Sequence, residues 1–78
     1  REENVEQIRT TSIMSNEIYF NKTGTFEICV FNLLGKQVKH FKNTFSKGHI
    51  LPLNIKNGIY ILQIKENHHF NNYKILID

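Results

Sequence analysis

The sequence predicts an all-β fold, a seven-stranded antiparallel immunoglobulin-like β-sandwich. Turn signals rich in glycine and asparagine recur at intervals of roughly 10–12 residues, a spacing typical of sandwiches and barrels. Between these turns the apolar residues alternate with a period of two, as expected when successive side chains of a strand point to opposite faces. No window shows the i, i+3, i+4, i+7 apolar spacing of a helix.

Turn residues divide the chain into its predicted strands. Glycine adopts a positive φ at little steric cost, and asparagine tolerates one. The predicted turns lie at 21–24, 33–36, 46–48, 56–58 and 66–69. The predicted strands therefore span 5–11, 13–20, 25–32, 36–42, 49–55, 58–66 and 70–78.

Two middle strands show the alternation clearly. In strand 25–32 the residues on one face are Phe26, Ile28 and Val30. In strand 49–55 the corresponding residues are Leu51, Leu53 and Ile55. Pro52 has no backbone N–H to donate to a ladder, so strand 49–55 is expected at a sheet edge or with a bulge at Pro52.

The last two strands form the C-terminal quarter of the chain. Strand 58–66 is apolar on both faces in its first half, with Ile59 and Ile61 opposite Tyr60 and Leu62. Two interpretations stay open, a central strand partly covered by neighbouring loops or an exposed patch that docks onto a partner. In strand 70–78, Tyr73, Ile75 and Ile77 alternate with Lys74, Leu76 and Asp78.

Strand 36–42 and the loop after it interleave basic and aromatic residues. They are Lys36, Lys39, His40, Phe41, Lys42, Phe45 and Lys47. Such a segment can track a single-stranded nucleic acid, but lysines more commonly keep an outward strand face soluble. Attraction to the anionic outer leaflet of a bacterial surface is a third interpretation. With a net charge of only +3 we predict no nucleic-acid partner.

The length of the chain and its first residues limit its possible domain organisation. Seventy-eight residues make one domain, which buries only about 60–65% of its unfolded surface. No apolar run is long enough for a transmembrane helix. The start, Arg1-Glu-Glu-Asn4, is not a signal peptide. The chain is therefore either cytosolic or a fragment whose export signal lies upstream, and the polar start favours the fragment.

No catalytic residue and no metal site is predicted. Cys29 is the only cysteine, so an internal disulfide is excluded, and no Cys–His pairing is evident that would make it a nucleophile. The histidines lack the paired spacing of structural zinc sites; they are His40, His49, His68 and His69. No nucleophile elbow, phosphate loop or carboxylate pair is present. We therefore expect no enzyme, no cofactor and no small-molecule substrate.

Three segments match the motifs of a known family in order and spacing. They are Ile28-Cys-Val-Phe-Asn-Leu-Leu-Gly-Lys-Gln-Val38, Ile55-Lys-Asn-Gly-Ile-Tyr60 and Lys74-Ile-Leu-Ile77. In this order they resemble the type A C-terminal sorting domain of the type IX (Por) secretion system of Bacteroidetes. The residues that match the family signature are Gly35, Lys36, Val38, Gly58, Tyr60 and Lys74. Lys56 replaces the usual proline, and the Pro-Asn-Pro sequence that many members carry near the first strand is missing.

The resemblance implies a sorting domain at 8–78, preceded by a polar linker remnant at 1–7. Such a domain does no chemistry and is a C-terminal secretion and surface-sorting signal. It follows a cargo domain in the same precursor, folds in the periplasm and directs the cargo to the outer-membrane surface or the medium. The implied partners are the type IX outer-membrane translocon, shuttle proteins and a sortase that can cleave the domain off.

The signature residues also have expected structural roles. Gly35 and Gly58 are expected to need a positive φ. Tyr60 is expected to fill the core with its hydroxyl at the rim, and Val38 is expected in the core. The hypothesised translocon contact is the final strand, because an edge strand can be recognised by β-augmentation; its residues are Tyr73, Lys74, Ile75, Leu76, Ile77 and Asp78.

An alternative function belongs to a different class. The same fold serves in fibronectin-like and carbohydrate-binding adhesion modules that stay on the mature protein, and the fold alone does not decide between the two. Tyr19, Phe31 and Phe41, on predicted outward positions, would then form the binding platform. A sorting domain is missing from the mature product, whereas an adhesion module is retained.

Overall fold

The computed structural model describes residues 11–14 and 16–78, and this part of the chain is all-β, without a helix. Its strands are β1 (Thr11–Met14), β2 (Glu17–Phe20), β3 (Gly24–Asn32), β4 (Gln37–Phe45), β5 (Ile50–Pro52), β6 (Gly58–Glu66) and β7 (His69–Ile77). All their pairings are antiparallel, which confirms the predicted class. The predicted linker 1–7 and the predicted strand 5–11, except for Thr11, lie outside the described residues.

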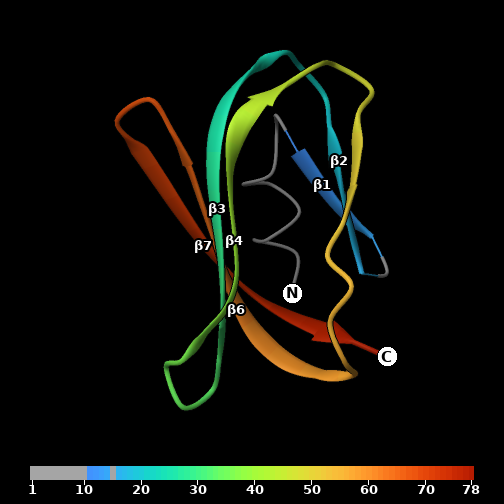
Figure 1. Cartoon of the computed structure of the whole chain (residues 1–78), viewed down its shortest axis with the longest axis vertical. Coiled ribbons are helices and arrows are strands. Elements are labelled where there is room, and N and C mark those ends of the chain that lie inside the picture. The colour runs from blue at the N-terminus through green and yellow to red at the C-terminus, as the bar shows by residue number, and fades with distance from the viewer. Residues whose placement is uncertain (1–10, 15) are drawn as a thin grey trace.

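The strands form two sheets. One sheet has the order β1-β2-β5, and the other has the order β4-β3-β6-β7. Figure 1 shows the long strands of the second sheet on one side of the molecule and β1 and β2 on the other. β6 is central in its sheet, between β3 and β7, but its outward residue Ile59 is 40% exposed, so each of the two interpretations of strand 58–66 holds in part.

The core lies between the two sheets. It is formed by Ile18, Phe20, Phe26, Ile28, Val30, Phe45, Leu53, Leu62, Ile64, Tyr73, Ile75 and Ile77. Phe20 stacks on Phe45 with ring centroids 4.4 Å apart, and Phe26 packs against Phe20 at 5.0 Å. The predicted faces of β3 and β7 are confirmed, because each contributes three alternating residues to this cluster. Burial of these side chains supplies about 25 cal/mol per Å² of apolar surface, the main stabilising term of the fold.

The segment predicted as one strand at 13–20 is instead a hairpin. β1 and β2 pair with Thr11 opposite Phe20 and Met14 opposite Glu17. The chain reverses next to Asn16, which has a φ of 60°. Asparagine tolerates this left-handed conformation better than most residues, so a single Asn is enough to break the strand in two.

β5 is shorter than its predicted range of 49–55. It lies at the edge of the three-stranded sheet, as Pro52 predicted, and Pro52 is its last residue. Beyond it the backbone leaves the sheet, with a φ of 55° at Asn54. The Asn16 side chain holds this departing segment, because its Nδ2 donates to the Ile55 carbonyl at 3.0 Å and its Oδ1 accepts from the Ile55 N–H at 3.3 Å.

Candidate recognition surface

The turn between β3 and β4 is organised by Asn32. Its side-chain Oδ1 accepts hydrogen bonds from the backbone N–H groups of Leu34 at 2.9 Å and Lys36 at 3.0 Å. Gly35 donates its N–H to the Asn32 carbonyl at 3.0 Å and has a φ of 86°. A Cβ added at Gly35 would meet nothing within 4 Å, so glycine is needed for its conformation and not for space.

The start of β6 is organised by Gly58 and Tyr60. Gly58 has a φ of 155°, which confirms the predicted positive value. Tyr60 is half-buried against the core, and its hydroxyl donates to the Lys56 carbonyl at 2.8 Å. A Cβ at Gly58 would lie 3.5 Å from the Tyr60 ring. Tyr60 therefore has the predicted role, with its ring on the core and its hydroxyl at the rim.

β7 divides its side chains between the core and solvent. Tyr73, Ile75 and Ile77 are 8% exposed or less, whereas Lys74, Leu76 and Asp78 are exposed. β7 is the last strand of its sheet, with β6 as its only sheet neighbour among the described residues. Half of the predicted recognition strand thus belongs to the core, and its exposed side chains are those of Lys74, Leu76 and Asp78.

The outer face of the sheet carries an apolar patch at the C-terminal end of β7. The ladder places Phe31 opposite Ile61 and Ile59 opposite Leu76, on neighbouring strands β3, β6 and β7. Ile59 is 40% exposed and Leu76 is 63% exposed, while Phe31 and Ile61 are partly covered. We call these residues, Phe31, Ile59, Ile61 and Leu76, the terminal patch.

Residues distant in sequence meet at this end of the sheet. Asn32 is opposite Tyr60, and Tyr60 is opposite Ile75, so the β3–β4 turn, the start of β6 and the end of β7 are neighbours. Figure 1 shows the β3–β4 turn and the C-terminus toward the same end of the molecule. The six signature residues lie here, on β7, at the start of β6, or in and after the β3–β4 turn.

One signature residue was placed wrongly. Val38 was expected in the core, but its side chain is 37% exposed. The register of β3 and β4 shifts between Val30 and Phe31, which pair with Lys39 and Gln37, so Val38 is the extra residue of a bulge on β4. This irregularity breaks the alternation of inward and outward residues from which the burial of Val38 was predicted.

A comparison with known protein families bears on this arrangement. The sequence model of the secretion system C-terminal sorting domain matches residues 6–78, which is nearly the whole chain. The chain belongs to this family. No curated protein and no solved structure matches it.

The family gives the sorting domain its general role. It is a C-terminal sorting signal of type IX secretion, which indicates a non-catalytic role and export to the outer-membrane surface or the extracellular space. It also implies a cargo protein that the type IX system recognises. The described part of the sorting domain has no helix of the length and hydropathy needed to cross a bilayer.

The basic segment of the sorting domain does not form one binding face. Lys39 is opposite Val30, on the side of β3 that faces the core, whereas Lys42 is opposite Glu27 on the outer side. Phe45 is buried, and Phe41 packs against the core. The aromatic rings are therefore unavailable to stack on nucleic-acid bases, and the prediction that placed Phe41 on an outward adhesion platform is wrong.

One group of polar side chains escaped the sequence analysis. Glu27 and Cys29 on β3 lie on the outer face together with His40 on β4, and His40 is directly opposite Cys29. Glu27 Oε2 and His40 Nε2 are 2.8 Å apart. The sequence shows these residues 2 to 13 positions apart, and only the strand register brings them together.

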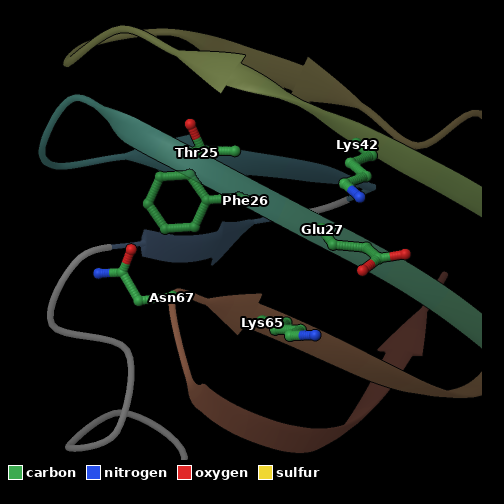
Figure 2. Close-up of a pocket in the computed structure, with 6 residues that line it drawn as sticks. All are labelled: Thr25, Phe26, Glu27, Lys42, Lys65 and Asn67. Carbon is green, nitrogen blue, oxygen red and sulfur yellow. The ribbon is translucent and has the colours of Figure 1, made fainter.

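A small open cavity adjoins this group. Its volume is about 230 Å³, and its lining is Thr25, Phe26, Glu27, Lys42, Lys65 and Asn67. Figure 2 shows Glu27 on β3 between Lys42 on β4 and Lys65 on β6. The cavity is smaller than the roughly 300–1,000 Å³ of most small-molecule sites, which agrees with a domain that acts through its surface.

Proposed function

We propose that the type IX translocon recognises this domain, folded in the periplasm, through the outward side chains at the end of β7 and the terminal patch. The observation that carries the proposal is the exposure of Leu76, 63%, on a strand whose alternate residues are core. An exposed apolar side chain on the last described strand of a sheet is a liability in a monomer, and a partner that docks on β7 would cover it.

The charges beside the patch suit a mixed apolar and polar contact. Lys74 is opposite Ile61 on the outer face and is one of the signature residues. Lys36 is exposed in the β3–β4 turn at the same end of the sheet. A partner strand with apolar residues flanked by acidic ones would complement this surface, because charge complementarity fixes the register of a docked strand.

Deleting 74–78 is a poor test of this proposal. The deletion removes Ile75 and Ile77 from the core, so loss of export would follow from unfolding as well as from lost recognition. Substitutions confined to the outer face separate the two causes. Leu76→Ser keeps the buried residues of β7 and alters an exposed side chain of the proposed contact.

The test of the function is a sorting assay. Residues 1–78 are fused behind a fluorescent protein with an export signal, in a bacterium that has the type IX system and in its translocon-deficient mutant. We expect fluorescence on the surface or in the medium of the first strain and in the periplasm of the second. Equal periplasmic retention in both strains would contradict the proposal and favour a retained adhesion module.

We propose that a sortase removes the domain after translocation and that shuttle proteins deliver it to the sortase. Cleavage in the polar segment Arg1–Asn4, or upstream of it, would remove no residue of the described strands, and polar terminal segments are preferred sites of proteolysis. Mass spectrometry of the surface-exposed cargo tests this step. A mature product that still carries peptides from 11–78 would contradict it.

We also propose that the sandwich is immunoglobulin-like. Lettered A, B, C, C′, E, F and G in chain order, the strands give sheets A-B-E and C′-C-F-G. This is the division of strands between the two sheets that immunoglobulin-related domains use. The strand order supports the assignment, and an experimental structure compared with immunoglobulin-fold domains would test it.

A further inference from the structure

The outer face of β3 and β4 gathers three different metal-ligand side chains. Cys29 and His40 are cross-strand partners, and Glu27 lies two residues before Cys29 on the same face of β3. One ligand atom from each residue lies within 4.8 Å of the other two. A carboxylate oxygen, a thiol sulfur and an imidazole nitrogen are the three donor types that zinc uses in proteins.

We propose that Glu27, Cys29 and His40 form a zinc-binding site on the surface of the four-stranded sheet. Zinc in tetrahedral geometry holds nitrogen and oxygen ligands at about 2.0–2.2 Å and thiolate sulfur at about 2.3 Å, so its ligand atoms lie roughly 3.3–3.8 Å apart. The present separations reach that range by small side-chain rotations. The 2.8 Å contact between Glu27 and His40 has to widen by only about 0.5 Å to admit the ion.

The site is open on its solvent side. The His40 side chain is 43% exposed, that of Glu27 is 32% exposed, and Cys29 is partly buried. Three protein ligands on a sheet surface leave a fourth position for water or for a ligand from a partner. Such a site is weaker than a closed four-ligand site, and it is accessible to zinc from the medium.

Neighbouring charged groups and the protonation of the ligands affect zinc binding at this site. Lys42 and Lys65 are the cross-strand partners of Glu27, and their positive charges oppose a cation, whereas Gln63, opposite Cys29 on β6, is neutral. The hydrogen bond from His40 is the main reason why the pKa of Glu27 is lowered, so this carboxylate is ionised at neutral pH. Partial burial raises the pKa of the Cys29 thiol, and the nearby Glu27 charge adds to this effect. Zinc binds the thiolate form of cysteine, so it must displace the Cys29 proton, and binding becomes tighter as pH rises.

Zinc at this position would join β3 to β4. The two strands are also joined by their backbone ladder and by the Thr25–Thr44 and Glu27–His40 side-chain contacts, and their register shifts between Val30 and Phe31. Cys29 lies next to Val30, so a bridge from Cys29 to His40 would fix the register beside the bulge. Cys29 lies two residues before Phe31 on the same outer face of β3, so the site borders the terminal patch.

The test uses residues 1–78, kept reduced with a thiol-free reductant, and titrates Zn²⁺ by calorimetry in two buffers of different ionisation enthalpy. We expect one zinc per chain and a net release of protons. Co²⁺ in place of Zn²⁺ should give a thiolate-to-cobalt charge-transfer band and the visible bands of tetrahedral cobalt. Cys29→Ser should abolish the charge-transfer band, and His40→Ala, like Glu27→Gln, should weaken zinc binding by at least about tenfold.

The controls are His68→Ala in the β6–β7 turn and Glu17→Gln on β2, which remove the same ligand types elsewhere. Both should bind zinc like the parent chain, and circular dichroism should show every variant folded. Zinc binding that Cys29→Ser leaves unchanged, or that His68→Ala weakens as much as His40→Ala, would overturn the proposal. So would the absence of binding by the folded, reduced parent chain at micromolar zinc.

Discussion

Ile59 on β6 and Leu76 on β7 are directly opposite each other in the antiparallel ladder, and both side chains face away from the core. Their neighbours in sequence, Tyr60 and Ile75, also form a cross-strand pair, but on the inner face. The same two strands thus stabilise the sandwich on one side and expose an apolar pair on the other. Exposed apolar pairs of this kind are typical of surfaces that a partner covers.

Substitution of two leucines on paired strands by alanine should have very different effects on the free energy of unfolding. Leu62 is fully buried and Leu76 is 63% exposed. We expect Leu62→Ala to lower the free energy of unfolding by about 2–5 kcal/mol, because it leaves a cavity in the core. Leu76→Ala should change it by no more than about 0.5 kcal/mol. Urea denaturation followed by circular dichroism measures both, and equal losses would contradict the assignment of inner and outer faces.

Export should decrease when Leu76 is replaced, and should not decrease when a comparable exposed apolar residue elsewhere is replaced. We expect Leu76→Ser to reduce surface fluorescence of the fusion while leaving its unfolding midpoint unchanged. The matched control is Ile50→Ser, because Ile50 is a 47% exposed apolar residue on β5, the edge strand of the other sheet. Quantitative fractionation measures export. Equal export of the two variants would show that the terminal patch is not recognised.

The β3–β4 turn should need the backbone conformation of Gly35. Gly35→Ala introduces a Cβ at a φ of 86°, and we expect a loss of about 1–2 kcal/mol in the free energy of unfolding. Gly35→Asn should cost less, since asparagine tolerates the left-handed region. Nothing lies within 4 Å of the added Cβ, so steric contact does not contribute. Equal costs for the two variants, measured by denaturation, would contradict this explanation.

Tyr60 should stabilise the start of β6 through its hydroxyl as well as its ring. We expect Tyr60→Phe to lower the free energy of unfolding by about 0.5–1.5 kcal/mol, because the hydrogen bond to the Lys56 carbonyl is lost. The bond lies at the exposed rim, which favours the lower end of this range. Tyr60→Ala removes the ring contact with the core as well and should cost more. If Tyr60→Phe lowered the free energy of unfolding as much as Tyr60→Ala, the hydroxyl would account for the whole loss and the ring contact for none of it.

Alkaline pH should destabilise the fold through Tyr73. Burial raises the pKa of the Tyr73 phenol above its ordinary value of 10.0. The unfolded chain therefore loses this proton first, so the stabilisation is complete below about pH 10 and is lost as pH rises through the folded-state pKa. We expect a smaller dependence of stability on alkaline pH in Tyr73→Phe. Denaturation across this pH range measures the slope, and an unchanged slope would contradict the assignment.

Three of the four long strands, β3, β6 and β7, were predictable because their faces have different environments, whereas β4 ends at Phe45, three residues beyond its predicted end at 42. β6 was predicted at its observed bounds, Gly58–Glu66, and the predicted bounds of β3 and β7 are within one residue of the observed ones. Strict alternation in β3 and β7 places one set of side chains in the core, so the period-two pattern is strong there. The turn residues Gly35 and Gly58 were predictable for a related reason, since few other residues adopt their φ values.

The parts that escaped prediction depend on register and on single residues. The β1–β2 hairpin turns next to Asn16, which carries no glycine or proline signal. The exposure of Val38 follows from a bulge, and a bulge is invisible in a pattern of alternating residues. The proximity of Glu27 and Cys29 to His40 follows from the pairing of β3 with β4. The spacing of these residues in the sequence does not show that they are neighbours. Counting residues outward from the β3–β4 turn could have indicated which residues of the two strands face each other.

The most direct test of the central claim is site-specific photo-crosslinking in cells that are exporting the fusion. A photoreactive amino acid replaces Leu76 in one strain and Ile50 in a second, and crosslinked products are identified by mass spectrometry. We expect a crosslink from position 76 to a component of the outer-membrane translocon and none from position 50. A crosslink to the translocon from position 50 alone would place recognition on the other sheet and contradict the account.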